Sequence, residues 1–382
     1  MERRRRALEG LDVKAAFWAG KRVLVTGHTG FKGGWLSLWL LRLGAKVAGY
    51  SLPPATEPSH FALVRLEQKI DNVIGDIRDA ERLSRAVREF EPEIVFHLAA
   101  QSLVRYSYAN PIETFEVNAL GTAHLLEALR GAPSTRAIVI VTSDKCYENR
   151  EWPWAYRENE AMGGYDPYSA SKGCAELIAA SFRNSYFATA DHPMRGAALA
   201  TARAGNVIGG GDWAADRLVP DILRALERGE KAQIRFPQAV RPWQHVLEPL
   251  AGYLTLAERL WNDGAPFAEA WNFGPDPSGE RTVGEIADAL CRAYGEGAGW
   301  TKSGGDEPHE AHLLKLDSAK ARSRLGWRPQ WSIFEALEAI VDWDARRRRG
   351  EDVETTSLRQ IDAYSRRMDA AQHGASTPGA TP

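Results

Sequence analysis

A doubly wound parallel sheet with a smaller C-terminal α/β region is the fold that this sequence predicts. Short apolar strands alternate with helical stretches over roughly the first 200 residues, an order typical of parallel sheets covered by helices. A glycine-rich turn joins the first strand to the first helix. Residues 137–141 (AIVIV) form an uninterrupted apolar run, which indicates a strand buried on both faces.

The expected elements follow in order along the chain. Residues 1–20 read as a basic arm with a short lead-in. Apolar runs bounded by glycine, proline or charged residues predict strands at 21–26, 45–50, 94–100 and 137–141 and helices at 35–43, 79–90 and 119–130. After about residue 205, three consecutive glycines at 209–211 and scattered prolines divide shorter elements. These features are expected of a second region laid over the mouth of the sheet.

The composition is that of an ordinary globular protein. Of 382 residues, 44% are apolar and 26% are charged, enough for one large α/β unit or two domains. The net charge of −2 gives no bias toward nucleic acid or anionic membranes. Three cysteines, at 146, 174 and 291, lack metal-ligand spacing, and no apolar stretch follows the basic start MERRRR. The sequence therefore predicts a reduced cytoplasmic protein without metal site, signal peptide or membrane span.

The glycine-rich turn VTGHTGFKGGW has the chemistry of a dinucleotide site. Gly27, Gly30 and Gly33 form a G-x-x-G-x-x-G array between a predicted strand and a predicted helix. Glycines allow a tight turn against a pyrophosphate, and the helix N-terminus offers free N–H groups. The second strand ends at Tyr50-Ser51 with neither a carboxylate for the adenine ribose nor an arginine for a 2′-phosphate. This motif therefore leaves the choice between NAD and NADP open.

Polar and ionisable residues at three further positions suggest a reaction centre. The buried run at 137–141 leads into Ser143, Asp144 and Lys145, and a Tyr-x-x-x-Lys pair follows at Tyr168 and Lys172. Spacing i, i+4 places the pair on one helix face, where an ammonium is expected to lower the pKa of the phenol from about 10. Such a phenol can take a proton from an alcohol while hydride leaves for a nicotinamide.

These motifs together resemble the extended short-chain dehydrogenase/reductase superfamily over about residues 20–345. The likeness rests on TGHTGFKG, GDI, HLAAQ, Val117-Asn118, the strand-end hydroxyl, Tyr168-x-x-x-Lys172 and SRLGWRP. Within the superfamily the chain is most similar to the CDP-glucose 4,6-dehydratases, through TSDKCYENREW, GGYDPYSASKGCAE, RAGNVIGGGDW and RPWQHVLEPL. The implied architecture is a Rossmann-type NAD-binding domain at 21–205 with returns from about 240–275, a mainly substrate-binding region at 206–350, and a tail at 353–382 with a disordered end.

The resemblance also implies roles for individual residues. Ser143 would bond the sugar O4, and Asp144 would protonate the departing C6 hydroxyl. Lys145 stands where dTDP-glucose dehydratases have glutamate. It would either take the C5 proton as a neutral amine or stay charged and stabilise the enolate; a lysine merely paired with Asp144 is the structural alternative. Asn118 is expected to brace the backbone.

Cofactor and substrate contacts follow from the same resemblance. Those implied for NAD are Gly27, Gly30, Phe31, Lys32, Gly33, Asp76, Ile77, Leu98, Ala99, Ala100, Val117, Tyr168, Lys172 and Val207. Those implied for the nucleotide sugar are Ser143, Asn206, Arg217, Leu218, Arg235, Arg241, Asn272 and His245. Asp76 has the alternative of an N-cap or a solvated acid. The substrate positions other than Ser143 have the alternative of a surface or structural role, above all the lone His245.

The reaction expected by resemblance is the dehydration of CDP-glucose to CDP-4-keto-6-deoxyglucose, without net redox change. It would serve the synthesis of deoxysugars for surface polysaccharide such as lipopolysaccharide, and a homodimer or homotetramer is implied. Two alternatives keep the fold: a nucleotide-sugar 4-epimerase, which needs no acid/base pair after Ser143, and a dehydratase acting on another nucleotide sugar. A third, a non-catalytic dinucleotide binder, should have lost Tyr168, Lys172 or Ser143, yet the chain retains all three.

Overall fold

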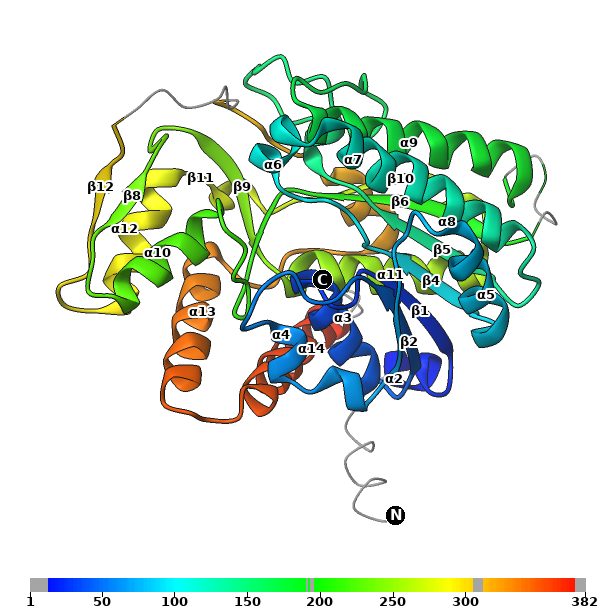
Figure 1. The fold of residues 1–382 in the computed structure, drawn as a ribbon, viewed down its shortest axis with the longest axis horizontal. Coiled ribbons are helices and arrows are strands. Elements are labelled where there is room, and N and C mark those ends of the chain that lie inside the picture. The colour runs from blue at the N-terminus through cyan, green and yellow to red at the C-terminus, as the bar shows by residue number, and fades with distance from the viewer. Residues whose placement is uncertain (1–12, 190–191, 193–195, 305–311, 375–382) are drawn as a thin grey trace, which may run out of the picture.

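A seven-stranded parallel sheet forms the centre of the protein (Figure 1). The computed structural model describes residues 13–189, 192, 196–304 and 312–374, so the expectations for the arm at 1–12 and for the end at 375–382 lie outside the described residues. The strands lie in the order β10-β6-β5-β4-β1-β2-β3, and each pairs in parallel with its neighbours. They are β1 (Arg22–Thr26), β2 (Lys46–Ser51), β3 (Asp71–Ile74), β4 (Ile94–His97), β5 (Ala137–Val141), β6 (Ala198–Ala204) and β10 (Ala270–Phe273).

Helices cover both faces of this sheet, as predicted for a doubly wound fold. Alternate strand residues face opposite layers: Val23, Val139 and their equivalents join one core, while Leu24, Ile138 and theirs join the other. The first layer holds α2 (Val13–Trp18), α3 (Phe31–Arg42), α11 (Leu247–Asp263) and α14 (Val353–Gly374), and the second holds α5 (Ala80–Phe90), α8 (Gly121–Arg130) and α9 (Pro167–Tyr186). Beside α8 and α9 run α6 (Val104–Ala109), α7 (Pro111–Phe115) and the π-helix η2 (Glu116–Leu120).

The strand order reverses between β1 and β4. From β1 the chain adds β2 and β3 on one side, and it then returns to add β4, β5 and β6 on the other. At such a switch point the loops after neighbouring strands diverge and leave a crevice at the carboxyl ends, where open α/β sheets bind their ligands. The glycine-rich turn after β1 and the Leu98–Ala100 segment after β4 both lie there.

A second, smaller region has its own apolar core. It contains β7 (Asn206–Ile208), β8 (Ala232–Ile234), β9 (Val240–His245), β11 (Glu280–Thr282), β12 (Trp300–Lys302), α10 (Leu218–Glu227), α12 (Val283–Tyr294) and α13 (Ile333–Arg348). Ile222, Leu290 and Leu337 are buried in its centre. Figure 1 shows this region at the left, beside the mouth of the large sheet. Helix α11 and strand β10 then return the chain to the large sheet.

Short elements complete the described chain. They are α4 (His60–Leu63), η1 (Leu66–Gln68), η3 (Asp144–Cys146), η4 (Ala265–Phe267), η5 (Pro277–Gly279) and the π-helix η6 (Ala321–Leu325). Within the described chain, no helix is both long and apolar enough to cross a bilayer.

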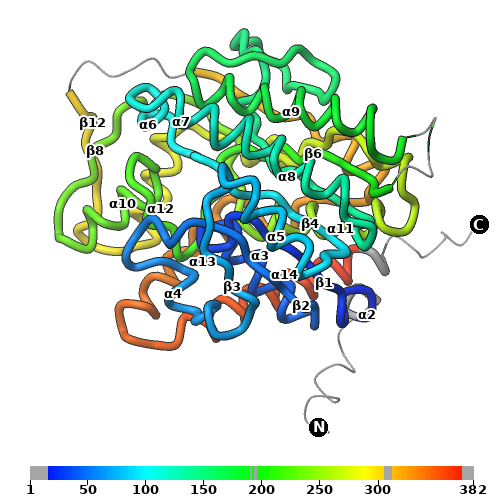
Figure 2. Tube along the Cα trace, turned by 45° about the vertical axis from the view of Figure 1, so that its right-hand side comes forward, coloured from blue at the N-terminus to red at the C-terminus, as the bar shows by residue number. Residues whose placement is uncertain are grey.

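Both expected terminal extensions differ from the structure within the described residues. Trp18 is fully buried and its Nε1 donates to Glu258 at 2.7 Å, so the lead-in belongs to the core. The expected tail begins instead with α14, whose Ile361 and Tyr364 are fully buried. Figures 1 and 2 both place α14 beside α3, where Arg42 binds Asp362 at 2.9 Å. Sparse apolar residues made α14 read as a tail, yet a few at helical spacing are enough to dock one face.

Candidate active site

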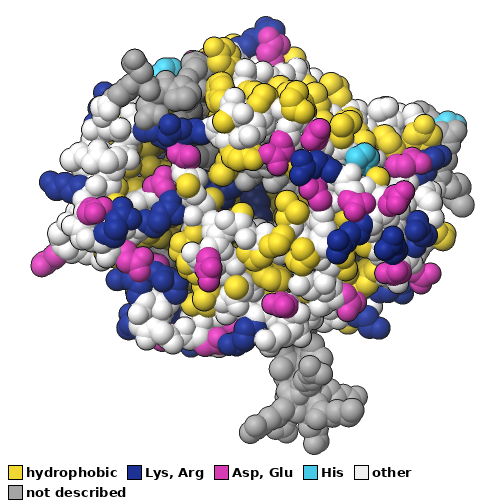
Figure 3. Space-filling view, viewed as in Figure 1, with side chains coloured by type: hydrophobic (Ala, Val, Ile, Leu, Met, Phe, Trp, Pro, Cys, Tyr) yellow, Lys and Arg dark blue, Asp and Glu magenta, His cyan; other side chains and the backbone are white. Residues whose placement is uncertain are grey.

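A cavity of about 600 Å³ opens at the carboxyl ends of the strands, between the large sheet and the second region. Figure 3 shows the hollow on this face of the molecule, with basic side chains inside it. The loops after β1, β2, β4 and β5 form one side of the cavity, and residues of α10, β8 and β9 form the other. A ligand that fills the cavity therefore contacts both regions.

The glycine cradle, residues 27–33, lies at the base of this cavity. Gly27 has φ +75°, and a Cβ there would lie 2.6 Å from the Ala99 nitrogen. A Cβ on Gly33 would overlap the Gly27 carbonyl oxygen. Gly30 is the N-cap of α3 and offers no side-chain cap, so the first amides of the helix can bind an anion. The cradle thus fits a pyrophosphate.

The far end of the cavity carries hydroxyl groups and one carboxylate. Thr29 and Ser51 line it, with their oxygens 2.9 Å apart. The Tyr50 hydroxyl donates to the Asp76 carbonyl at 2.9 Å. Asp76 lines the cavity, and its carboxylate accepts from Arg78 at 2.6 Å. That hydrogen bond keeps the pKa of Asp76 below its usual value, so Asp76 presents a charged acceptor.

The strand-end trio sits at the centre of the cavity, in the 3₁₀ turn η3 after β5. The Ser143 hydroxyl donates to Asp144 Oδ1 at 3.0 Å and accepts from the Lys145 amide at 3.2 Å. Asp144 is 2% exposed, and burial raises the pKa of its carboxyl against the opposing charges of Lys145, Arg241 and Lys32. A raised pKa suits a carboxyl that must hold a proton and deliver it. Lys145 is half-buried beside it.

Tyr168 and Lys172 face the same cavity from the first turns of α9. Asp166 caps this helix by accepting from the Ser169 amide at 2.9 Å. The expected lowering of the Tyr168 pKa is wrong for this structure: burial raises it to about 12, against the opposing effect of the Ser143 hydroxyl. Burial also lowers the pKa of Lys172 to about 8. Because burial disfavours both charged forms, the pair can pass a proton without holding a fixed charge.

His97, which sequence reasoning did not single out, connects the cofactor side of the cavity to η2. The Thr122 hydroxyl donates to the Asn118 carbonyl at 2.7 Å, so at 3.1 Å it accepts from His97 Nε2–H. His97 Nδ1 is then an acceptor for the Thr26 hydroxyl at 2.7 Å, which itself accepts from the Ala99 amide at 3.3 Å. Burial lowers the pKa of His97 to about 3, as this neutral tautomer requires.

Asn118 braces backbone, as the sequence suggested. Its side chain donates to the Gln101 carbonyl at 2.9 Å and to Ser171 Oγ at 2.8 Å. Ser171 in turn donates to the Tyr168 carbonyl at 2.7 Å. The loop after β4 and the first turn of α9 are therefore held to the same π-helical segment, and π-bulges of this kind are frequent at functional sites.

Glu176, a second residue that sequence reasoning did not single out, links three elements by hydrogen bonds. Glu176, one turn after Lys172 on α9, accepts from Arg203 at 2.8 and 2.9 Å, from Thr142 at 2.5 Å and from Thr201 at 2.7 Å. Glu176 and Arg203 have side chains only 5% and 3% exposed. Thr142 directly follows β5 and precedes Ser143, so this carboxylate links α9, β6 and the end of β5 at the level of Ser143 and Lys172.

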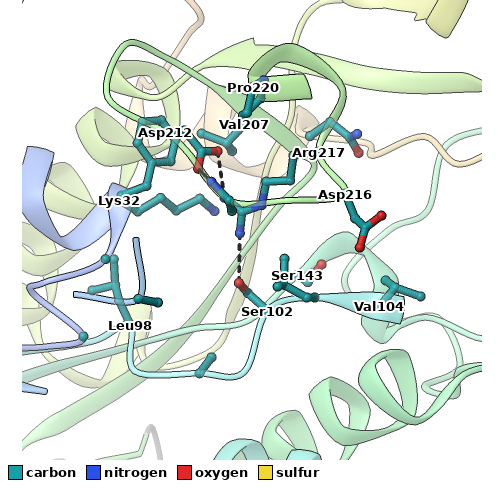
Figure 4. Close-up of a pocket in the computed structure, with 18 of the residues that line it drawn as sticks. Lys32, Leu98, Ser102, Val104, Ser143, Val207, Asp212, Asp216, Arg217 and Pro220 are labelled. Atoms are coloured by element: carbon teal, nitrogen blue, oxygen red, sulfur yellow. Dashed lines mark hydrogen bonds and ion pairs between the residues drawn. The ribbon is translucent and has the colours of Figure 1, made fainter. Parts of the chain in front are cut away.

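Arginines of the second region face the cavity, each already held by an acidic or carbonyl group. Arg217 donates to Asp212 at 2.8 Å and to Ser102 at 2.8 Å, and Figure 4 shows Lys32 pointing toward it. Arg235 lies 3.5 Å from Asp216, and Arg241 donates to the Val240 carbonyl at 2.9 Å. A diphosphate would suit these cations.

The structure places most of the expected site residues on this one cavity. The lining includes Gly27, Gly30, Phe31, Lys32, Gly33, Asp76, Ile77, Leu98, Ala99, Ala100, Val117, Ser143, Asp144, Lys145, Tyr168, Lys172, Asn206, Val207, Arg217, Leu218, Arg235 and Arg241. It also includes Ser102, Asp212 and Asp216, which sequence reasoning missed. For Asp212 and Asp216 the only signal in the sequence was a pair of acids in DWAADR, which ordinary loops also contain.

Two expected substrate contacts, Asn272 and His245, lie elsewhere. Asn272 is fully buried on β10, where its side chain donates to the Tyr156 and Asp317 carbonyls and accepts from Tyr147. His245 is 1% exposed and packs 4.7 Å from Trp331, between ring centroids. Neither lines the cavity. The alternative given for them, a structural role, fits this structure better, because segments distant in the sequence pack around both side chains.

Comparisons with known proteins agree with this geometry. The family model described as GDP-mannose 4,6-dehydratase matches residues 24–250. A curated CDP-glucose 4,6-dehydratase from Salmonella typhimurium is 57% identical over 348 residues, which is 91% of this chain and 97% of that protein.

Solved structures also resemble the chain in fold. A dTDP-glucose 4,6-dehydratase from Streptomyces venezuelae with NAD bound superposes with a TM-score of 0.73 at 26% identity, covering 87% of this chain and 99% of the other. A UDP-glucose 4-epimerase from Thermus thermophilus in complex with NAD gives a TM-score of 0.72 at 25% identity, covering 84% and 98%.

Proposed function

This chain belongs to the GDP-mannose 4,6-dehydratase family, and on that premise we propose that it is an NAD-dependent CDP-glucose 4,6-dehydratase, a hydro-lyase. The observation that carries the proposal is the Ser143-Asp144-Lys145 turn facing Tyr168 in the cavity that also contains the glycine cradle. The 57% identical CDP-glucose 4,6-dehydratase supports the choice of substrate.

The cradle and the neighbouring loops fit NAD. The α3 amides at Phe31, Lys32 and Gly33 would hold the pyrophosphate, and the backbone at Leu98–Ala100 would flank the rest of the dinucleotide. When bound, NAD accepts hydride from C4 of the glucosyl group and later supplies it to C6.

The chain's own residues then divide the proton transfers. Tyr168, with Ser143 beside it, takes the O4 proton and gives its own proton to Lys172 as C4 becomes a ketone. The ketone acidifies C5–H, and Lys145 either removes that proton or stabilises the enolate as a cation. Asp144, whose pKa is raised by burial, gives its proton to the C6 hydroxyl, which leaves as water. Hydride at C6 and a proton at C5 complete CDP-4-keto-6-deoxyglucose, so one water is lost and the cofactor is regenerated.

Asp144, next to Ser143, favours a dehydratase over an epimerase. An epimerase only removes hydride from C4 and returns it, so it needs no proton donor for a departing hydroxyl. Here the donor is buried at the centre of the cavity, and its Oδ2 has no hydrogen-bond partner among the described residues. In this proposal, that oxygen carries the proton that passes to the C6 hydroxyl.

Product formation tests the proposal. Purified protein, NAD⁺ and CDP-glucose should develop the alkaline absorbance of a 4-keto-6-deoxy sugar, whereas UDP-, dTDP- and GDP-sugars should not. A signal with another nucleotide alone would keep the dehydratase and overturn the cytidine assignment. Absence of any signal, with NAD bound, would favour an epimerase or a non-catalytic binder.

We further infer a cytoplasmic homo-oligomer that contributes deoxysugars to surface polysaccharide such as lipopolysaccharide. The apolar side chains Ile112, Leu120 and Leu177, on α7, η2 and α9, are 71%, 52% and 61% exposed. An apolar face of this kind supports burial against a second copy as a homodimer, or within a homotetramer. Sedimentation velocity of wild type and Leu177→Asp tests it: the variant should form a smaller assembly than wild type, and an unchanged assembly would exclude this face.

A further inference from the structure

The adenosine end of the cavity has no charged residue where a ribose-binding acid would stand. Strand β2 ends at Ser51, and residues 50–56 (YSLPPAT) contain no acidic and no basic side chain. Ser51, Leu52, Pro53, Ala55 and Thr56 nevertheless line the cavity together with Thr29. Asp76 also lines it, but Arg78, which binds Asp76, does not. At the end of β2, where a ribose-binding acid would stand, only neutral groups are therefore present.

The hydroxyls of Thr29 and Ser51 form a chain with a fixed direction. Thr29 Oγ1 donates its one hydrogen to the Leu52 carbonyl at 2.9 Å. It lies 2.9 Å from Ser51 Oγ, so in that contact Ser51 is the donor. Both hydrogens are then used, and Ser51 Oγ is left with lone pairs only.

The backbone holds this hydroxyl chain in place. The Gly75 amide donates to the Ser51 carbonyl at 2.8 Å, so Ser51 is fixed in the sheet. Thr29 is 6% exposed and immediately precedes Gly30, the N-cap of α3. The hydroxyl chain is therefore continuous with the cradle that would hold the pyrophosphate.

We propose that Ser51 Oγ, oriented by Thr29, is the acceptor for the adenosine 2′-hydroxyl and makes this chain prefer NAD over NADP without a carboxylate at the end of β2. The inference rests on the proposed use of NAD and names the residues that choose the dinucleotide. A ribose hydroxyl donates to the free lone pairs. A 2′-phosphate brings only acceptor oxygens at neutral pH and meets no cationic side chain in residues 50–56.

The preference is moderate because a serine can rotate. If Ser51 turned to donate to a 2′-phosphate, it would give up its hydrogen bond to Thr29. One exchanged neutral hydrogen bond corresponds to a factor of about three to ten in affinity. A carboxylate at the same place would add charge repulsion and discriminate more strongly.

Binding measured without turnover tests the proposal. Isothermal titration of the full chain, freed of co-purified nucleotide, gives the ratio Kd(NADP⁺)/Kd(NAD⁺) for wild type and for Ser51→Ala, Thr29→Val, Thr29→Ser and Ser51→Asp. We expect a ratio on the order of ten in wild type and Thr29→Ser. It should approach one in Ser51→Ala, which loses the acceptor, and fall in Thr29→Val, which frees the Ser51 hydrogen. It should rise in Ser51→Asp.

The outcomes separate this inference from the proposed function. Ratios in Ser51→Ala and Thr29→Val equal to that of wild type, with NAD⁺ still bound, would overturn the hydroxyl chain while leaving the dehydratase intact. Equal affinities in wild type would do the same. Failure of wild type to bind either dinucleotide would overturn both. Ser51 is only partly buried, so Ser51→Ala decides the matter even if Thr29→Val does not fold.

Discussion

The substitution Glu176→Gln is expected to destabilise the protein strongly and to shift its pH profile. In the folded protein the Glu176 carboxylate accepts four hydrogen bonds, two of them from Arg203. A glutamine keeps the volume but brings one acceptor oxygen and two donors, and it leaves the guanidinium of Arg203, 3% exposed, without a counter-charge. Removing one partner of a buried pair costs about 3–5 kcal/mol.

Urea unfolding followed by circular dichroism measures this cost. Glu127→Gln is the matched control, because Glu127 pairs with Arg130 at side-chain exposures of 56% and 49%, and such exposed helix pairs contribute only about 0.3–0.5 kcal/mol. In a double-mutant cycle, Arg203→Met in the Glu176→Gln background should recover part of the loss, since no buried charge is left unpaired.

Glu176→Gln should also change the pH–rate profile, which a loss of stability alone would not do. The Glu176 charge raises the pKa of Lys172 against the larger effect of burial. Without that charge the pKa of Lys172 falls further, so the limb of the pH–rate profile that Lys172 controls should move to lower pH. A loss below about 1 kcal/mol together with an unshifted profile would refute the reasoning.

Three further predictions concern the cavity. Asp144→Asn should lower turnover by about 10²–10⁴-fold yet still reduce bound NAD on addition of CDP-glucose, seen as absorbance at about 340 nm; normal turnover would contradict its role as acid. For Lys172→Met, unfolding free energies at several pH values should exceed those of wild type by about 3 kcal/mol at neutral pH, because the pKa of Lys172 is lowered to about 8. Between pH 8 and pH 10.5 the folded wild type binds fewer protons than the unfolded wild type, so wild type gains stability as pH rises. The stability advantage of Lys172→Met should therefore shrink as pH rises toward 10.5. A difference that stays constant with pH would argue against the lowered pKa of Lys172. His97→Leu leaves the Thr26 and Thr122 hydroxyls without their ring partner and should cost about 1–3 kcal/mol with weaker NAD binding, whereas unchanged NAD affinity would confine His97 to stability.

The local sequence pattern was sufficient to predict those parts of the site whose residues are neighbours along the chain. The glycine cradle needs glycine at fixed offsets after a strand, and Tyr168 and Lys172 need only one helical turn between them. Ser143, Asp144 and Lys145 follow a strand whose buried character is plain from five apolar residues. These features could be predicted because each is built within a dozen residues.

Features that depend on distant segments could not be predicted in the same way. Asn272 and His245 were expected as ligands through the family resemblance, but partners more than 40 residues away enclose them. Helix α14 owes its stability to packing against α3 and α13. The pKa of Tyr168 depends on how completely the fold buries it, and that burial outweighs the opposing effects of the Ser143 hydroxyl and the Arg217 charge.

Transfer of isotope within the sugar tests the central claim most directly. CDP-glucose carrying deuterium at C4 would be incubated with the protein and NAD⁺, and the product examined by NMR and mass spectrometry. The account predicts deuterium at C6 of a 4-keto-6-deoxy sugar, because hydride removed at C4 is returned to C6 after water leaves. Deuterium retained at C4 of a recovered or epimerised hexose would contradict it.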